Sequence, residues 1–173
     1  SKQSVVFMNK LTEDLLLLSL VDIEFEKKVL NLEEILNDAI AGAKKFANGG
    51  GFKIDVKMKG NMKILGNEVL LRRAFQNLME NAIKYSNGDR LEIDVSKQRN
   101  AVKILFKDNG VGIPKDVQGK IFDRFYRVDK SRSRKTGGSG LGLAITKEII
   151  ERHNGTIQYI DGKGATFELM LRN

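Results

Sequence analysis

Two glycine-rich segments are the most informative chemical feature of this sequence. The first, residues 108–114, reads DNGVGIP, and the second, residues 137–143, reads GGSGLGL. Glycines at this spacing let a backbone approach a ligand closely and adopt positive φ without steric cost. Free backbone amides beside cations bind phosphate groups. The pattern therefore predicts a phosphate site, and the acidic Asp108 is expected to face another part of the same ligand.

A basic segment connects the two glycine clusters. Residues 123–135 carry six cations and two acids, an excess of +4 in a chain whose formal net charge is +8. Such a run is often only a solvated face. The glycines beside it favour a phosphorylated ligand instead. The sequence has no basic stripe interleaved with aromatic residues and no evident reading helix, which argues against nucleic acid as the partner.

Asn77, Asn81 and Lys84 share one face of a predicted helix, because they are spaced at i, i+4 and i+7. Asparagine is a poor helix former, so two aligned in the middle of a helix require an explanation. They form either a polar face turned to water or an amide pair beside a phosphate chain. In the second case an amide oxygen could ligate Mg²⁺, and Lys84 would offset phosphate charge.

Three other polar residues have competing interpretations. Asp108 either caps its own turn or accepts a hydrogen bond from an exocyclic amine such as that of adenine. Glu80 lies on about the same side of its helix as the two asparagines and is a minor candidate for a general base. His153, the only histidine, is expected to be structural, at a helix C-terminus where a cation suits the helix dipole.

Composition limits the other classes of function. The chain has 173 residues, 41% of them hydrophobic and 30% charged, which is enough for one globular domain with a sizeable core. It contains no apolar run of the roughly 18 residues that a membrane span needs. The absence of Cys excludes disulfides and fits a reducing compartment, and with a single His it makes a zinc site very improbable.

The elements that must position these residues can be read from hydrophobic periodicity. Met8, Leu11, Leu15 and Leu18 predict the seam of a bundle or coiled-coil helix. Asn67 is the expected N-cap of the asparagine helix. Further helices are expected over residues 32–46, 67–85 and 140–152. Strands are expected over residues 52–58, 63–65, 91–96, 101–107, 156–160 and 165–171. Helices on one face of a largely antiparallel sheet make an α+β protein, a two-layer α/β sandwich.

The order of the motifs resembles the catalytic and ATP-binding domain of bacterial sensor histidine kinases, in the superfamily shared with gyrase, Hsp90 and MutL ATPases. Residues 77–85 (NLMENAIKY) are similar to the N box, and residues 121–127 (IFDRFYR) to the F box. Residues 108–112 and 138–143 are similar to the two glycine boxes, and residues 162–167 to the closing glycine motif. The resemblance covers about residues 30–173.

The resemblance implies a Bergerat-type ATP-binding fold, with about three helices on a five-stranded mixed, mostly antiparallel sheet. It also implies a division of the chain. Residues 1–28 would be the C-terminal remnant of a dimerisation and phosphoacceptor bundle helix plus a linker, and residues 29–173 the catalytic ATP-binding domain.

The resemblance implies a role for each matched residue. Asn81 is expected to ligate the Mg²⁺ that bridges the ATP phosphates, while Asn77 contacts the phosphates or the metal shell. Asp108 is expected to accept the adenine amino group, and Arg127 to hold the γ-phosphate. Asn77, Lys84 and Arg127 are thus the expected catalytic residues. Further nucleotide contacts are expected from Lys84, Tyr85, Gly110, Gly112, Ile113, Phe122, Phe125, Gly138, Ser139, Gly140, Leu141, Gly142, Leu143 and Thr166.

Some of these residues would belong to a moving lid. Phe122 and Phe125 are expected to anchor it, over about residues 115–139. The glycines of the second cluster are expected to let it close over the phosphates.

The resemblance also implies the activity. Superfamily ATPases carry a water-activating Glu where Asn77 stands, and Asn cannot act as a base, so hydrolysis is expected to be poor. The γ-phosphoryl group would pass to a histidine on a dimerisation and phosphoacceptor domain, of the same or a partner protomer, for relay to the aspartate of a response regulator. The implied location is the cytoplasmic side of a membrane-anchored sensor kinase, with no membrane contact by this fragment. A superfamily ATPase or a protein-serine kinase is the alternative.

Overall fold

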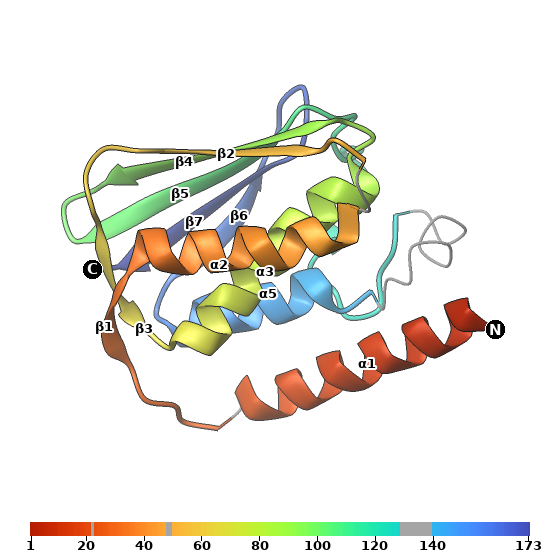
Figure 1. Ribbon diagram of the computed structural model, residues 1–173, viewed down its shortest axis with the longest axis horizontal. Coiled ribbons are helices and arrows are strands. Elements are labelled where there is room, and N and C mark those ends of the chain that lie inside the picture. Colours follow the sequence, from red (N-terminus) through yellow and green to blue (C-terminus); the bar gives the residue numbers. More distant parts are fainter. Residues whose placement is uncertain (22, 48–49, 129–139) are drawn as a thin grey trace.

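The computed structural model describes residues 1–21, 23–47, 50–128 and 140–173, apart from the side chains of Gln3 and Phe7. Within these residues a five-stranded sheet is covered on one face by helices (Figure 1). Its strands are β2 (Lys53–Met58), β4 (Arg90–Lys97), β5 (Ala101–Asp108), β6 (Thr156–Ile160) and β7 (Thr166–Arg172). The helices are α1 (Lys2–Val21), α2 (Leu32–Lys44), α3 (Glu68–Tyr85) and α5 (Gly142–Arg152). Short 3₁₀ turns cover Lys45–Ala47 and Gln118–Lys120.

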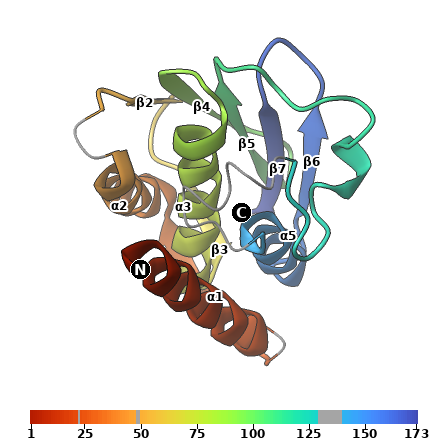
Figure 2. The same ribbon diagram turned by 90° about the vertical axis from the view of Figure 1, so that its right-hand side faces the viewer.

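The sheet has the strand order β2-β4-β5-β7-β6. β2 runs parallel to β4, and the other neighbouring pairs are antiparallel. Figure 2 shows α2, α3 and α5 on one side of the sheet, with α1 beyond them, against the outer side of α5. The predicted two-layer α+β sandwich on a mixed, mostly antiparallel sheet is therefore confirmed, and α1 is an addition outside the helical layer.

The core lies between the sheet and the helices. α3 buries an apolar stripe against the sheet, made of Leu71, Ala74, Phe75, Leu78 and Ala82. Phe75 lies 6.0 Å, centroid to centroid, from Phe106 of β5. In β4 and β5 every second residue is buried, because only one face of the sheet meets the helices. On the opposite face Lys107 pairs with Glu92 and Asp94 of the neighbouring strand.

One strand was not predicted. β1 (Lys28–Asn31) pairs antiparallel with β3 (Lys63–Gly66), just after the expected linker, which was placed no further than residue 28. β1 has four residues, too few to show alternation, and its strand form depends on its distant partner. Asn31 then caps α2 through its side chain, as Asn67 caps α3, and the second of these caps confirms a prediction.

His153 connects α5 to the start of α3. The backbone N–H of Asn67 donates to its Nε2 at 3.0 Å, so the proton must sit on Nδ1, which lies 2.7 Å from the carbonyl oxygen of Ile149. The ring is only 2% exposed, and burial lowers the pKa of His153. The predicted structural role is confirmed. The predicted cation is wrong, because a second ring proton would face the Asn67 donor.

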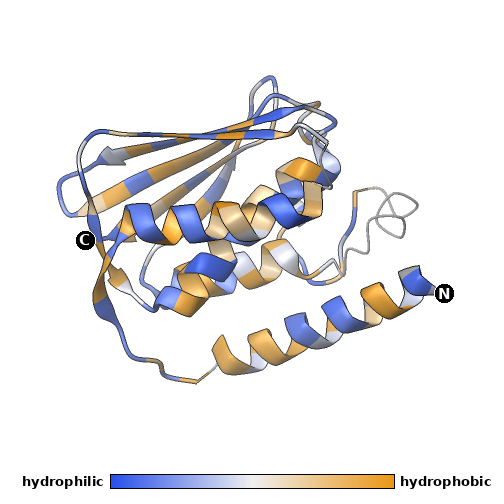
Figure 3. Ribbon diagram, viewed as in Figure 1, coloured by the Kyte–Doolittle hydropathy of each residue, from blue (hydrophilic) through white to orange (hydrophobic). Residues whose placement is uncertain are grey.

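α1 is apolar on more than one side, as its colouring in Figure 3 indicates. Its buried positions are Asp14, Leu18 and Val21, with Leu11 partly buried beside them. Within this chain, Met8 and Leu15 of the predicted bundle seam are exposed, whereas Leu18 is buried and Leu11 partly buried. The buried side instead follows the contacts with α3 and α5. No helix among the described residues is long and apolar enough to cross a membrane.

Candidate functional site

A cavity of about 510 Å³ lies where α1, α3, the loop after β5 and the start of α5 meet. Its volume falls in the range of about 300–1,000 Å³ that is usual for small-molecule sites. Ten of the predicted site residues line it. These are Asn77, Asn81, Lys84, Tyr85, Gly112, Ile113, Arg127, Gly140, Gly142 and Leu143. The rest of its lining comes from Lys10, Asp14, Glu80, Val111, Pro114, Ile121, Tyr126 and Val128.

The asparagine face of α3 forms one wall of this cavity. Asn77 is only 4% exposed, so for this residue the water-facing alternative is wrong. Its Nδ2 donates to the carbonyl oxygen of Gly142 at 3.3 Å, which ties the middle of α3 to the first turn of α5. Asn81 lies one turn further along the same wall. The side chains predicted to share a face therefore do share one, and it faces a cavity.

Lys84 continues that wall under partial burial. Its ammonium lies 4.7 Å from the ring centroid of Phe46. Burial lowers the pKa of Lys84, against the attraction of Glu80, and repulsion from Lys10 adds to the lowering. A cation with this little hydration interacts more strongly with an anion than one in bulk water, because the local dielectric constant is lower.

α1 adds charged residues that were not predicted to belong to the site. Lys10 Nζ lies 3.6 Å from Asp14 and 3.9 Å from Glu80 of α3, and both carboxylates are buried. Asp14 Oδ1 also accepts from Arg73 at 3.2 Å, and Gln76 donates to Glu80 at 3.1 Å. The i, i+4 spacing of Lys10 and Asp14 is a visible signal of a pair. It does not indicate which distant helix the pair meets.

Asp108 ends β5 and does not line this cavity, although Val111 and Gly112 of the loop that it begins do. Its Oδ1 accepts from the backbone N–H groups of Gly110 and Ala165, both at 3.0 Å, as a turn-capping aspartate does. Among the described residues no donor is bonded to Oδ2. Burial raises the pKa of Asp108 even though both hydrogen bonds lower it. The capping interpretation is therefore correct, and Oδ2 is still able to accept a ligand donor.

Gly110 contacts the chain itself. A Cβ at this position would lie 1.9 Å from the carbonyl oxygen of Ser86, the residue that follows α3. The next amide, that of Val111, donates to the same oxygen at 2.9 Å. The first glycine cluster is thereby fixed to the end of the asparagine helix. Gly110 does not line the cavity, whereas Gly112 does.

The expected lid anchors behave differently from each other. Phe122 is partly buried and packs edge-on against Phe167 at 6.1 Å. The Phe125 side chain is 58% exposed, so its predicted anchoring role is wrong for the side chain. Its backbone holds the segment instead. Phe125 has φ 65°, and its N–H donates to the carbonyl oxygen of Gly140 at 2.9 Å. The two backbones are so close that a Cβ on Gly140 would lie 2.9 Å from the Cα of Phe125.

The N-terminus of α5 opens into the cavity through Gly140, Gly142 and Leu143. The first amides of a helix lack intrahelical acceptors and carry partial positive charge, which suits an anion. Leu141 is fully buried beneath them. The predicted contacts Gly138 and Ser139 lie outside the described residues, as does the basic run from 129 onward.

Ile113 and Thr166, two further predicted contacts, differ in position, because only Ile113 lines the cavity. The amide of Ile113 donates to the hydroxyl of Tyr159 at 3.1 Å, which fixes the loop after β5 over the cavity. Thr166 lies at the start of β7, opposite Lys107, and does not line the cavity.

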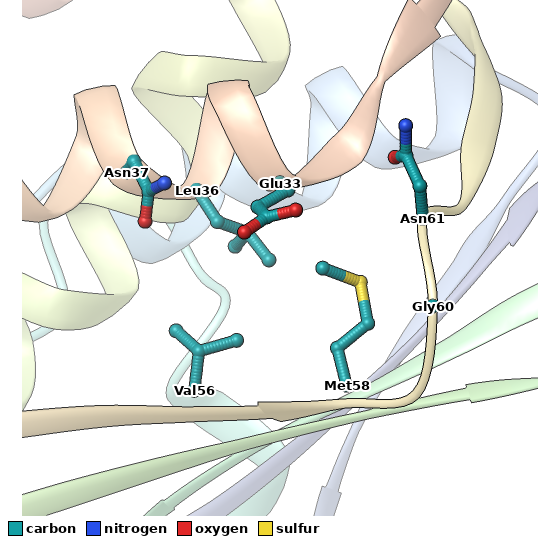
Figure 4. A pocket seen from close by; sticks show the side chains of 7 residues that line it. All are labelled: Glu33, Leu36, Asn37, Val56, Met58, Gly60 and Asn61. Atoms are coloured by element: carbon teal, nitrogen blue, oxygen red, sulfur yellow. The ribbon is translucent and has the colours of Figure 1, made fainter.

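A second cavity, of about 470 Å³, lies between α2 and β2. Figure 4 shows Glu33, Leu36 and Asn37 of α2 opposite Val56 and Met58 of β2. Among the described residues that line it, the one charged side chain is the acid Glu33, so this cavity does not suit a phosphate.

No group of three or more acidic or histidine side chains within the described residues is placed to hold a metal ion. The polar lining of the first cavity nevertheless includes the Asn81 carboxamide. A hard cation there would need most of its oxygen ligands from the bound molecule and from water.

Comparison with known proteins identifies the family. The family model described as histidine kinase-, DNA gyrase B-, and HSP90-like ATPase matches residues 66–173, more than half of the chain. The chain belongs to this family. The matched region contains α3, the first glycine cluster, the described part of the second cluster and α5. It therefore supplies all the described lining of the cavity except the part from α1.

Curated relatives within the family are sensor kinases. The sensor-like histidine kinase SenX3 of Mycolicibacterium smegmatis is 41% identical over 145 residues, which cover 82% of this chain and 38% of the relative. The sensor protein kinase WalK of Staphylococcus aureus is 41% identical over 172 residues, which cover 95% of this chain and 41% of the relative. The chain thus spans less than half the length of either relative.

Solved structures share the fold. Full-length ShkA in complex with AMPPNP matches with a TM-score of 0.80 at 23% identity, over 98% of this chain and 36% of that one. The mycobacterial sensor histidine kinase MprB matches with a TM-score of 0.71 at 24% identity, over 84% of this chain and 96% of that one. Family and relatives together confirm the resemblance to the histidine kinase catalytic domain.

Proposed function

We propose that this chain binds Mg-ATP in the 510 Å³ cavity and donates the γ-phosphoryl group to a histidine on a dimerisation and phosphoacceptor domain. One observation carries the proposal. A single cavity is lined by Asn77, Asn81, Lys84 and the N-terminus of α5. The chain that contains it belongs to a family of ATPases. Amide groups, a poorly hydrated ammonium and free helix amides suit a polyphosphate chain.

The two ends of the nucleotide meet different residues. Asp108 accepts the adenine amino group through Oδ2, and Gly112 and Ile113 lie against the base. Tyr85 lies on the ribose side. Arg127 and Lys84 hold the terminal phosphates, while the α5 N-terminus binds the phosphate chain. The support is positional, since all of these residues except Asp108 line the cavity, and Asp108 begins the glycine cluster whose Gly112 lines it.

Asn81 is the proposed protein ligand of Mg²⁺, through its carboxamide oxygen. When bound, the ion would neutralise part of the charge on the phosphate groups. Asn77 then contacts the phosphates or the waters around the metal. A metal held mainly by nucleotide and water agrees with the lack of an acidic cluster among the described residues.

Transfer to a protein is favoured over hydrolysis by the residues of α3. Asn77 has no basic group with which to activate water. Glu80, the minor candidate base, is engaged by Gln76 and lies beside Lys10. Catalysis then rests on positioning and electrostatic stabilisation, as is usual for phosphoryl transfer.

The proposed division of the chain places residues 1–28 in the remnant of a dimerisation and phosphoacceptor bundle helix with its linker. Residues 29–173 form the catalytic domain. The exposed apolar residues of α1, among them Val5, Met8, Leu15 and Leu16, support this division, because a helix that is apolar on several sides usually packs between partners. The acceptor histidine lies on the same or a partner protomer, and a response regulator receives the phosphoryl group on the cytoplasmic side.

The test mixes this chain with a separate bundle that bears the acceptor histidine and with ATP labelled in its γ-phosphate. We expect acid-labile label on the bundle. Acid-stable label would indicate a serine kinase, and steady release of phosphate without labelling would indicate an ATPase. Tight ATP binding with no label on any bundle would overturn the kinase proposal.

A further inference from the structure

α1 contributes a cation to the cavity at its phosphate end. Lys10 lines the same cavity as Asn77, Asn81 and Lys84, and its Nζ lies 3.9 Å from Glu80 of α3, which adjoins Asn81. Its side chain is only 14% exposed. An ammonium held this close to the proposed phosphate groups is in a position to bind them.

The charge of Lys10 is not committed to a tight pair. A charge-assisted hydrogen bond between an ammonium and a carboxylate spans about 2.7–2.9 Å. Lys10 lies 3.6 Å from Asp14 and 3.9 Å from Glu80, and each carboxylate has a nearer partner on α3. Arg73 donates to Asp14, and Gln76 donates to Glu80. The Lys10 ammonium can therefore turn to another anion without leaving either acid unpartnered.

A second observation points to an anion between Lys10 and the rest of the site. Repulsion from Lys10 is one of the causes that lower the pKa of Lys84, after burial, so the two ammonium groups lie within each other's field. Both line one cavity. A polyphosphate placed between them would be attracted to both ammonium groups and would offset their mutual repulsion. Like charges that line a protein surface favour the binding of an oppositely charged ligand in this way.

We propose that Lys10 is a phosphate-binding residue of the nucleotide site, supplied by α1 from outside the catalytic domain. This inference rests on the proposed ATP-binding function and deepens it. A nucleotide that contacts Lys10 holds α1 against α3, so ATP binding and α1 docking strengthen each other by the same factor. The phosphoryl group to be transferred is thereby held at the side of the cavity that adjoins the proposed bundle helix.

The test measures affinity for Mg-ATP and for adenosine by calorimetry on this chain. We expect Lys10→Met to weaken Mg-ATP binding about tenfold, the equivalent of one charged hydrogen bond, and to leave adenosine binding unchanged. Lys10→Arg should restore most of the affinity. Lys2→Met is the matched control, because it removes the same charge from an exposed position of the same helix and should change nothing.

A double-mutant cycle separates direct binding from neutralisation of Glu80. If Lys10 binds phosphate, the pair Lys10→Met with Glu80→Gln binds Mg-ATP about tenfold more weakly than Glu80→Gln alone. Equal affinities of these two variants would overturn the inference. So would unchanged Mg-ATP binding by Lys10→Met, or an equal loss for adenosine. Failure of the unaltered chain to bind Mg-ATP would instead refute the proposed function.

Discussion

Acidification should destabilise this protein through His153, its only histidine. The ring is 2% exposed, accepts the Asn67 N–H on Nε2 and faces the Ile149 carbonyl oxygen with Nδ1. A second ring proton would replace the Asn67 hydrogen bond by two opposed donors within a buried site. Burial is the main cause that lowers the pKa of His153, and the charge of Lys27 adds to it. The folded state therefore holds the neutral ring.

The direction and size of the effect follow from linkage. Because the folded pKa lies below the unfolded value of 6.5, the unfolded chain takes up the proton first as the pH falls. The stability that the neutral His153 ring contributes is fully present above about pH 6.5, the unfolded pKa. It is lost as the pH falls from there toward the folded pKa. The slope approaches about 1.4 kcal/mol per pH unit, so the loss between about pH 7.5 and pH 5.5 is at most about 1.4 kcal/mol.

Urea unfolding followed by circular dichroism at these two pH values measures the loss. His153→Gln is the control, since its side chain does not titrate and the carboxylates contribute equally to both proteins. We expect the variant to be less stable at neutral pH but nearly insensitive to pH in this interval. Parallel losses in the two proteins would refute the assignment of the effect to His153.

Three other predictions follow from single contacts. Gly110→Ala should lower the free energy of unfolding by about 1–3 kcal/mol in urea, because its Cβ would overlap the Ser86 carbonyl oxygen; Gly119→Ala, with open space around it, is the control and should cost far less. Asn81→Ala should remove most of the Mg²⁺-dependent gain in ATP affinity in calorimetry, and an unchanged gain would contradict the metal assignment. Asp108→Asn should keep the fold, because its amide oxygen can still accept both backbone donors, yet weaken ATP binding about tenfold. Unchanged affinity would contradict the adenine assignment.

The periodic elements of this fold could be predicted from the sequence because their burial repeats within a short window. The spacing of Leu71, Phe75 and Leu78 defines the buried side of α3, and the alternation in β4 and β5 defines theirs. β1 could not be predicted in this way, since a four-residue strand has no period of its own. The buried side of α1 could not be predicted from the sequence either, because it depends on the contact of Asp14 with Arg73, 59 positions away.

The candidate site divides in the same way. Asn77, Asn81 and Lys84 were predictable because helical spacing alone places them on one face. The position of Lys10 in the cavity depends on how α1 docks, which no local pattern encodes. The anchoring role expected for Phe125 came from the resemblance to the F box. Here close backbone contact with Gly140 fixes the segment and leaves Phe125 exposed.

One side chain links the proposed chemistry to the geometry of the site. The carboxamide of Asn77 has a donor as well as an acceptor, and its donor is used on the Gly142 carbonyl oxygen at the first turn of α5. An ionised glutamate in its place has only acceptors, so it could not make that bond and would repel the carbonyl oxygen. The Asn77 side chain, which cannot act as a general base, is therefore also the one that donates a hydrogen bond from α3 to α5. Under the proposed function, the Asn77 amide both lacks a base that could activate water and positions the end of α5 that is proposed to bind phosphate.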